Sequence, residues 1–405
     1  MTAAVQVVVA GGGPVGLLVA VLLSREPAIQ ITVLEPGPDP GPIDDELGFR
    51  VYALSRASER VLSYVGAWPL IATRAGPYDR MVVWEAGHAL GANGGLVFDA
   101  EDNAEPNLGH IVDHEGLCFS LGQQAAQRGN VTIQYGTGVD EIDQVASCIR
   151  GSDGKDYPFD LLIGADGSAS QVRAEFDIPV HEHSYKQRAL VGHVASEQPH
   201  AYTAWQCFLP TGPVALLPMI NGKCGLVWSV DDAEADVLAA LSEDEFNARL
   251  TDATESVLGR VSLTSERGVF PLKFLHAERY CETGMVLVGD AAHTVHPLAG
   301  QGLNLGILDA AALAQVVSEA MQDGQHPADR QVLRRYERWR KSENLSMAVG
   351  LDGLHHLFKL PAPWFPPLRR LGMSALTQVR PARRLLMAKA MGLQGDLPAV
   401  ARFAA

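Results

Sequence analysis

Residues 7–16 read VVVAGGGPVG, an apolar run that is followed by glycines at positions 11, 13 and 16. The run predicts a buried strand, and the G-x-G-x-x-G spacing lets the backbone turn tightly before a helix begins. We expect that helix to continue through Leu23, and a second strand, Ile31 to Leu34, to end in Glu35. Strand, glycines, helix, strand and acid in this order are typical of a fold that binds a dinucleotide.

A second stretch, residues 285–309, reads MVLVGDAAHTVHPLAGQGLNLGILD. Its first four residues predict a buried strand, and Asp290 places a carboxylate at the strand end, where it can accept hydrogen bonds from hydroxyl groups. Pro297 and the following glycines interrupt regular structure before a helix that we expect from Leu303 to Ala320. A helix that begins among glycines presents unpaired N–H groups to an anion or to an electron-rich ring edge. Taken alone, the stretch also fits an ordinary strand, turn and helix.

A third motif, D-G-x-x-S-x-x-R, begins at Asp166-Gly167 and ends at Arg173. The three motifs together resemble the class A flavoprotein aromatic hydroxylases, which include para-hydroxybenzoate hydroxylase. Within that class, the segments RVYAL at 50–54, LGHIV at 108–112 and HPLAGQGLNLG at 296–306 resemble the ubiquinone-biosynthesis hydroxylases. Residues 197–200 and 391–398 look most like the branch that acts at ring carbon 5 of a 2-polyprenylphenol. The likeness extends from about residue 5 to about residue 400.

The resemblance implies an α/β fold. A Rossmann-like FAD-binding domain, similar to that of para-hydroxybenzoate hydroxylase, would be interleaved with an antiparallel β-sheet substrate domain and followed by a helical C-terminus. We expect the FAD-binding domain at residues 1–75, 105–180 and 280–345, the substrate-binding sheet at 76–104 and 181–279, and the helical segment at 346–405. The turn signals Gly212-Pro213 and Asn221-Gly222 separate apolar runs in the second range, which favours an antiparallel sheet.

The composition excludes several classes of protein. A chain of 405 residues, 47% hydrophobic and 20% charged, can bury a large core and form two entwined domains. A net charge of -15 argues against nucleic acid as a partner. The five cysteines show no C-x-x-C spacing, so we expect a reduced chain without a metal site. Residues 1–6 contain no basic residue, so we expect no secretory signal; we also expect no transmembrane helix and a cytoplasmic protein.

The resemblance also assigns roles to the cofactor-binding residues. The glycines of the first motif would approach the FAD pyrophosphate, Glu35 would bind the adenosine ribose, and Asp290 would bind the ribityl or phosphate region. Arg50 would lie along the pyrophosphate or the flavin, and a surface arginine is the alternative. Backbone N–H groups from Gly300 to Asn304 would face flavin N1 and the C2 carbonyl. The full set of expected FAD contacts is Gly11, Gly13, Gly16, Glu35, Arg50, Asp166, Gly167, Gly289, Asp290, Pro297, Gly300, Gln301, Gly302, Leu303 and Asn304.

The chemistry that the resemblance implies is hydroxylation of the aromatic ring of a polyprenylated phenol in ubiquinone biosynthesis. FAD would be reduced by NAD(P)H or another electron donor, react with dioxygen to a C4a-hydroperoxide, and transfer one oxygen atom to the ring. Because the cofactor carries the hard step, we assign no catalytic base; His293, His296 and Pro297 are the candidates near the ring, and a structural hydrogen bond is the ordinary role of such histidines. A hydroxylase of a soluble phenol, a flavin-dependent dehydrogenase or reductase, and a non-catalytic FAD-binding member stay open.

One segment departs from the family pattern. Where related proteins read close to E-N-x-V-I/L-Q, this chain has DHEGLC at residues 113–118. Because the residue types differ, no FAD contact is assigned to this segment.

The C-terminal segment differs in charge from the rest of the chain. Residues 353–405 contain eight basic residues and one acid, a charge of +7, so residues 1–352 carry -22. The basic residues alternate with apolar ones, as an amphipathic surface requires. One hypothesis is that this segment docks the enzyme at anionic lipid or at an acidic partner in a ubiquinone-biosynthesis complex. The alternative is a pair of helices packed on the acidic body of the protein itself. A homo-oligomer is also compatible with the sequence.

Overall fold

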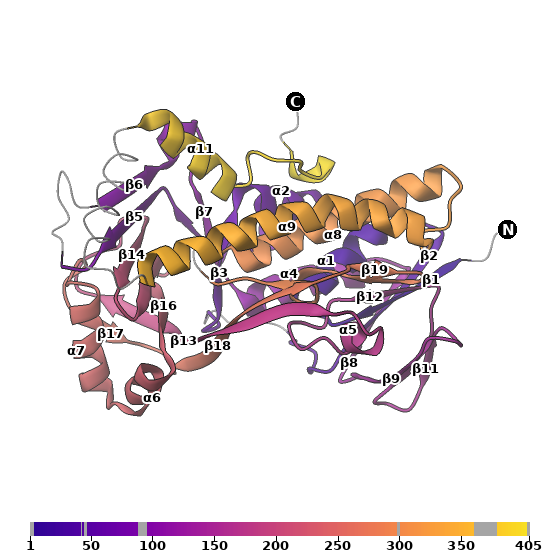
Figure 1. Ribbon diagram of the computed structural model, residues 1–405, viewed down its shortest axis with the longest axis horizontal. Coiled ribbons are helices and arrows are strands. Elements are labelled where there is room, and N and C mark those ends of the chain that lie inside the picture. Colours follow the sequence, from indigo (N-terminus) through magenta and orange to yellow (C-terminus); the bar gives the residue numbers. More distant parts are fainter. Residues whose placement is uncertain are drawn as a thin grey trace.

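The computed structural model describes residues 4–41, 43, 47–87, 95–297, 300–359 and 379–402. Two large sheets lie end to end, and the long helices α8 (Gln301–Gln322) and α9 (Arg330–Lys359) lie side by side across them (Figure 1). Leu298 and Ala299 of the HPLAGQGLNLG segment, and residues 360–378 of the C-terminal segment, lie outside the described residues.

The first sheet has six strands and contains the two apolar runs of the opening motifs. Its order is β19-β20-β12-β1-β2-β8, and every neighbouring pair is parallel except β19 with β20. Helices cover the sheet, and its central strands β1 and β12 are accordingly almost uniformly apolar; Val7 to Ala10 are at most 2% exposed. The strands are β1 (Val5–Ala10), β2 (Ile29–Glu35), β8 (Val131–Tyr135), β12 (Leu161–Gly164), β19 (Cys281–Glu282) and β20 (Met285–Leu287).

The second sheet has nine strands and follows the order β21-β18-β13-β16-β15-β14-β5-β6, with β17 paired to β13. It is antiparallel, as predicted, except that β5 and β14 run parallel. The strands are β5 (Arg80–Glu85), β6 (Gly95–Asp99), β13 (Val180–Ser196), β14 (Thr203–Leu209), β15 (Gly212–Pro218), β16 (Cys224–Asp231), β17 (Val261–Leu263), β18 (Gly268–Ala277) and β21 (His293–Thr294).

The remaining elements are two small sheets, helices and 3-10 turns. Two three-stranded sheets have the orders β3-β7-β4 and β11-β10-β9. Their strands are β3 (Val51–Ser55), β4 (Gly76–Tyr78), β7 (Gly109–Asp113), β9 (Val139–Asp143), β10 (Cys148–Gly151) and β11 (Asp156–Pro158). The remaining helices are α1 (Pro14–Leu23), α2 (Arg56–Tyr64), α3 (Trp68–Ala72), α4 (His114–Ala126), α5 (Gln171–Glu175), α6 (Asp232–Ala240), α7 (Glu243–Ala253) and α11 (Arg380–Ala390), with single 3-10 turns η1 (Ala100–Asn103), η2 (Gly289–Ala291) and η4 (Ala399–Ala401).

Helix α8 is the centre of the core. Among the described residues it is the one helix long and apolar enough to cross a membrane, and 72% of its most apolar window is buried inside the protein. It packs against α1, α2 and α9, and Leu313 and Val317 are fully buried. A helix that is apolar on most sides is therefore used here as a core element.

The C-terminal segment packs on the body of the protein. Arg383 of α11 forms an ion pair with Asp102 in η1, with 2.7 Å between Nη2 and Oδ2. Met387 and Met391 are buried in an apolar cluster with Ala100 and Leu108. This face of α11 agrees with the packing alternative that the sequence left open.

Candidate active site

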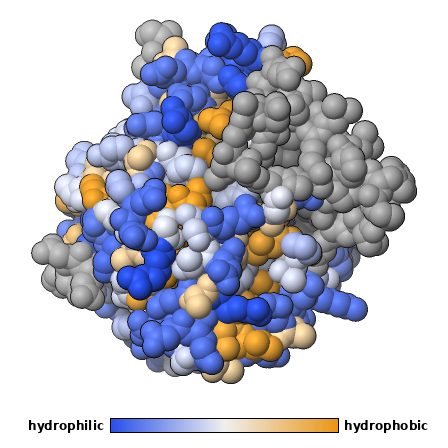
Figure 2. Space-filling view, turned by 90° about the vertical axis from the view of Figure 1, so that its left-hand side faces the viewer, coloured by the Kyte–Doolittle hydropathy of each residue, from blue (hydrophilic) through white to orange (hydrophobic). Residues whose placement is uncertain are grey.

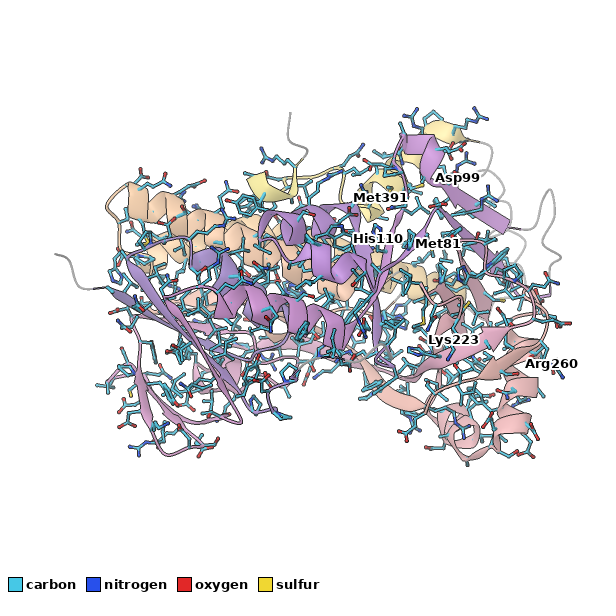
Figure 3. The ribbon with its side chains drawn as sticks, turned by 180° about the vertical axis from the view of Figure 1, so that it is seen from behind. Met81, Asp99, His110, Lys223, Arg260 and Met391 are labelled. Atoms are coloured by element: carbon cyan, nitrogen blue, oxygen red, sulfur yellow. The ribbon has the colours of Figure 1, made fainter. Side chains whose placement is uncertain are left out.

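A cavity of about 750 Å³ lies where the two sheets meet. One wall consists of loops that follow strands of the six-stranded sheet, and the opposite wall is one face of the nine-stranded sheet. Met81 lies on the sheet wall, near Met391 of the C-terminal segment, and both are labelled in Figure 3. The predicted site residues that line the cavity are Gly13, Arg50, Gly167, Gly289, Asp290, Pro297, Gly300, Gly302 and Leu303.

The three glycines of the β1–α1 turn have separate roles. Gly11 has a φ of 102°, and a Cβ atom there would lie 2.4 Å from the carbonyl oxygen of Ala165. A Cβ atom at Gly16 would lie 2.0 Å from the carbonyl oxygen of Gly11. Gly13 lines the cavity, and nothing lies within 4 Å of its Cβ position. The first and third glycines therefore permit close packing, and Gly13 exposes backbone at the start of α1.

Glu35 lies at the end of β2, where the acid of a dinucleotide fold is expected. Its Oε2 accepts a hydrogen bond from the N–H of Gly12 at 2.6 Å, and its Oε1 accepts one from the N–H of Gly37 at 2.7 Å. Each oxygen keeps a second lone pair, so the carboxylate can still accept a ribose hydroxyl. Glu35 is not part of the cavity wall described above.

Asp166 shapes a loop, and its neighbour Gly167 faces the cavity. The Oδ2 atom of Asp166 accepts hydrogen bonds from the N–H groups of Gln171 and Val172 at the start of α5. Arg173, at the end of this motif, donates to the carbonyl oxygen of Ser168 at 3.0 Å and to that of Ala291 at 2.8 Å. The arginine thereby joins this loop to the loop that carries Asp290.

Asp290 presents a carboxylate to the cavity. No hydrogen bond joins that carboxylate to any residue that the structure describes. Burial raises its pKa, and the positive charges of His293, Arg50 and Lys273 oppose the rise. A half-buried carboxylate that faces the cavity has lone pairs available, so this position favours a ligand with hydroxyl donors.

The two candidate histidines lie behind the cavity. His293 Nε2 lies 2.5 Å from Asp309 Oδ2, and Arg340 Nε donates to Asp309 Oδ1 at 2.8 Å. Burial alone would raise the pKa of Asp309, but His293 and Arg340 hold it well below its usual range. His296 is buried with its ring against Tyr185. Neither histidine belongs to the cavity wall, so the geometry favours the structural role for both.

The N-terminus of α8 reaches the cavity through part of the predicted segment. Gly300 has a φ of 62° and caps the helix, and Gly302 and Leu303 line the cavity beside it. Gln301 donates from Nε2 to the carbonyl oxygen of Ala390 at 3.3 Å, away from that wall.

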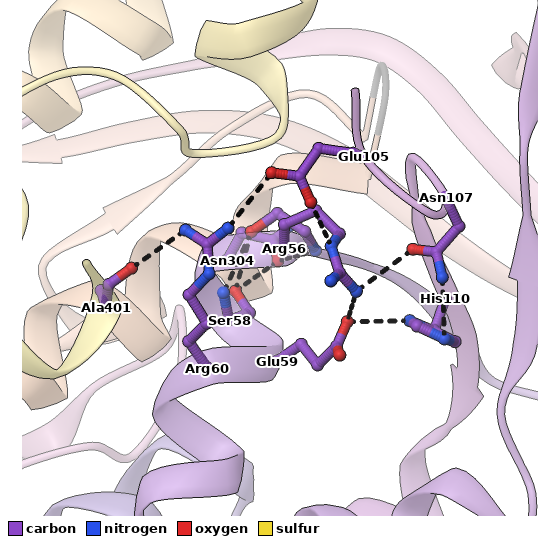
Figure 4. A network of polar contacts seen from close by, with 10 residues as sticks. Arg56, Ser58, Glu59, Arg60, Glu105, Asn107, His110, Asn304 and Ala401 are labelled. Atoms are coloured by element: carbon purple, nitrogen blue, oxygen red, sulfur yellow. Dashed lines mark hydrogen bonds and ion pairs between the residues drawn. The ribbon is translucent and has the colours of Figure 1, made fainter. Parts of the chain in front are cut away.

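Asn304 instead holds α8 to its neighbours (Figure 4). Its Oδ1 accepts hydrogen bonds from the N–H of Ser55 at 2.9 Å and from the hydroxyl of Ser58 at 2.6 Å, and its Nδ2 donates to the carbonyl oxygen of Ala53. The same network of polar contacts extends through Arg60 to the carbonyl oxygen of Ala401. The side chain of Asn304 therefore fixes the position of the helix N-terminus.

Two side chains that the sequence did not single out also line the cavity. The Tyr52 hydroxyl lies 3.0 Å from Nδ1 of His114, and Arg50 lies over the Tyr52 ring. Burial, together with the charge of Arg50, lowers the pKa of His114 to about 4. His114 belongs to the DHEGLC segment at residues 113–118. That segment departs from the family pattern, and the departure gave no indication that His114 lines the cavity.

Several small residues lie among the larger ones on the sheet wall of the cavity. Ala204 of β14, Ala215 of β15, Ser229 of β16 and Ala189 of β13 face the cavity. Alternate residues on the same strands face the other way and include Cys207, Leu216, Trp228 and Leu190, which form a core with α6 and α7. Because side chains alternate across a strand, one face of the sheet packs on helices, and the small residues on the other face leave room for a ligand.

Comparison with known proteins agrees with this geometry. A family model described as "FAD binding domain" matches residues 4–347. The chain is 34% identical to 3-demethoxyubiquinol 3-hydroxylase of Escherichia coli (strain K12), over 96% of this chain and 98% of that protein. The chain belongs to the FAD-dependent hydroxylases. The predicted resemblance to ubiquinone-biosynthesis hydroxylases is confirmed, as is the prediction of an FAD-dependent aromatic monooxygenase.

A further relative supports the assignment, and a solved structure has the same fold. The mitochondrial ubiquinone biosynthesis monooxygenase COQ6 of Danio rerio is 32% identical, over 95% of this chain and 89% of that protein. The crystal structure of p-nitrophenol 4-monooxygenase PnpA from Pseudomonas putida DLL-E4 superposes with a TM-score of 0.78 at 20% identity, over 98% of this chain and 100% of that chain. This second likeness shows the same fold.

The residues of this hydroxylase fit its cofactor. Gly13 leaves space and backbone donors at the N-terminus of α1, as a pyrophosphate requires. Asp290 offers an acceptor without a protein partner, which suits the ribityl hydroxyls, and the N-terminus of α8 suits an electron-rich ring edge. FAD, NAD(P)H or another electron donor, and dioxygen are the cofactors and co-substrates of the enzyme, as predicted.

Proposed function

We propose that this enzyme hydroxylates the aromatic ring of a polyprenylated phenol in ubiquinone biosynthesis. The observation that carries the proposal is the cavity between the FAD-binding loops and the sheet face with the small residues, a cavity whose wall is mostly apolar. The names of the relatives from Escherichia coli and Danio rerio support the same pathway. When bound, FAD supplies the redox chemistry by which one oxygen atom of dioxygen is added to the ring.

The residues of the chain bind, orient and exclude water. Asp290 and the backbone at Gly13 would hold the cofactor, and the N–H groups at the start of α8 would stabilise negative charge on the reduced ring. Pro297 would lie at the ring face where oxygen reacts. The apolar face of the sheet keeps water from the reacting oxygen, so that the oxidising equivalent is transferred to the phenol instead of being lost.

The apolar wall is the reason to favour a prenylated substrate over a soluble phenol. Each CH₂ group that is removed from water contributes about 0.8 kcal/mol to binding. The affinity for phenols with alkyl tails should therefore rise with tail length until the cavity and its exit are filled. Equal affinity for phenol and for 2-octylphenol would instead favour the soluble-phenol hydroxylase.

Complementation tests the reaction directly. The gene should restore quinone synthesis in one of a set of bacterial strains that each lack a single ring hydroxylase, and the accumulated precursor should disappear by mass spectrometry. The branch that acts at ring carbon 5 is our expectation, and a named relative acts at another ring position, so the set must contain a strain for each position. Failure in every strain, despite a folded FAD-loaded protein, would contradict the proposal.

We also propose that the outer face of α11 contacts anionic membrane lipid, where a prenylated substrate resides. Val379, Leu385 and Leu386 are 49%, 57% and 47% exposed, and Arg380 and Arg384 lie exposed among them. Figure 2 shows one end of the molecule, on which apolar side chains form small groups between hydrophilic ones. A contact of this kind is shallow and depends on charge as well as on burial.

A further inference from the structure

Gln206 is a buried amide in the apolar wall of the cavity. It lies on β14, its side chain is 8% exposed, and it lines the cavity beside Ala204. The residues paired with it across the sheet are Ala215 of β15 and Val83 of β5. The two residues directly opposite Gln206 therefore have no polar side chain that could bind its amide.

The amide of Gln206 has no partner in the protein. No hydrogen bond joins its Oε1 or Nε2 to any residue within the described ranges. The polar atoms of Gln206 face the cavity, so both their donor and acceptor capacity are available to a ligand that enters it. By contrast Gln187, which is also buried, donates from Nε2 to the carbonyl oxygen of Thr211 at 2.6 Å.

The position of Gln206 relates it to the loop that carries Pro297. Val83, opposite Gln206, and Phe208, two residues along the same strand, form one apolar cluster with Val295. Val295 lines the cavity two residues before Pro297. Gln206 therefore belongs to the part of the sheet wall that faces the expected ring of the cofactor.

We propose that the Gln206 amide binds an oxygen substituent on the aromatic ring of the substrate and thereby determines which ring carbon faces the reacting oxygen. An amide carries one acceptor and two donor hydrogens, so it can bind a phenol hydroxyl or a carbonyl oxygen. The apolar wall holds the ring and the tail without fixing rotation of the ring in its own plane. A single polar anchor removes that freedom, and Gln206 is thus a specificity-determining residue.

This inference rests on the proposed function. A pair of ligands tests the role of Gln206 separately from that function. The FAD-loaded enzyme is titrated with 2-butylphenol and with butylbenzene, which lacks the hydroxyl, and binding is followed by the change in flavin absorbance. The wild type should bind 2-butylphenol roughly five- to tenfold more tightly, because a net hydrogen bond contributes about 1 kcal/mol. Gln206→Leu should reduce this ratio to about one while it keeps the affinity for butylbenzene.

Two controls separate the loss of a ligand contact from a general effect of the substitution on the fold. Gln187→Leu makes the same change at a buried glutamine that lies off the cavity wall, and it should leave the ratio at its wild-type value. The thermal midpoint of substrate-free Gln206→Leu should equal or exceed that of the wild type, since an amide without a protein partner does not hold the sheet together.

Two results would overturn the inference. One is an unchanged ratio in Gln206→Leu; the other is a melting temperature several degrees below that of the wild type, which would show that the amide has a structural role. Neither result would contradict hydroxylation of prenylated phenols. The complementation experiment tests that proposed function separately. In the strain that the wild type rescues, Gln206→Leu should release more hydrogen peroxide per quinone formed, because the ring is wrongly presented.

Discussion

At the scale of single residues, the β1–α1 turn separates packing from ligand binding. Gly16 touches the backbone of Gly11, whereas the Cβ position of Gly13 points into open space on the cavity wall. A side chain at Gly16 therefore disturbs the protein, and one at Gly13 disturbs only what binds there.

We expect Gly13→Val to fold but to lack FAD, because the new methyl groups occupy the space in which the pyrophosphate must lie. Gly16→Val should fail to fold, since its Cβ would lie 2.0 Å from the carbonyl oxygen of Gly11. Flavin absorbance measures the first effect, and circular dichroism of the FAD-free proteins measures the second. A yellow Gly13→Val protein with full flavin content would contradict this view of the turn.

The sequence predicted residues of the cavity wall only where a local motif fixes the backbone. Gly13, Asp290 and Gly302 line the cavity because they stand at fixed offsets from strand ends and helix starts. Tyr52 and Gln206 are brought to the same cavity by pairing between distant strands, and no spacing in the chain encodes that pairing.

At the scale of elements, most strands and helices were predictable from apolar runs and caps. Ser55 caps α2, and Ser242 with Glu245 forms a capping box on α7. The parallel pairing of β5 with β14 was not predictable, because the two strands lie far apart in the chain and the hydrophobic pattern of a strand does not indicate the direction of its partner.

The stability of the folded protein should depend on pH because a histidine is buried where β18 pairs with β21. His276 pairs with His293 across this junction and is 3% exposed. Burial, with the positive charges of His293 and Lys341 adding to it, lowers the pKa of His276 to about 4. In the unfolded chain the imidazole takes up a proton near pH 6.5, so the unfolded state gains protons first as the pH falls. Stability is therefore lost from about pH 6.5 down to about pH 4.

Between pH 7.5 and pH 5.0, the free energy of unfolding in urea should fall less for His276→Gln than for the wild type. The difference between the two losses should be at most about 2 kcal/mol. His181→Gln is the matched control, because His181 lies opposite His276 on β13 but is exposed. If both variants show the same pH dependence as the wild type, His276 is not a source of the acid sensitivity.

At the scale of the whole molecule, the C-terminal helix has two faces. Arg383 and Met387 pack on the body, and Arg380 and Arg384 point outward. The charge pattern of the sequence predicted an amphipathic segment, but it could not assign each arginine to a face, because that depends on where η1 places Asp102.

The outward face should bind anionic vesicles in a salt-sensitive manner. We expect Arg380→Glu with Arg384→Glu to reduce the affinity for such vesicles, measured by sedimentation, at least about thirtyfold, since each of the two basic residues near the surface contributes about 1 kcal/mol. Arg150→Glu with Lys155→Glu makes the same change in net charge on the β9–β11 sheet and should leave binding unchanged. Equal loss in the two variants would indicate that net charge, not this helix, controls the interaction.

The order of strands in the six-stranded sheet means that the sheet can be completed only late in translation. β1 is made first, yet it lies between β2 and β12, and the next strand outward, β20, comes only at residue 285. A ribosome that adds about 5 to 20 residues per second needs roughly 15 to 60 s to cover that interval. Throughout it, α1 lacks α8, a helix that packs on it, so part of its apolar surface stays exposed on the nascent chain. Flavin can be inserted only near the end of translation.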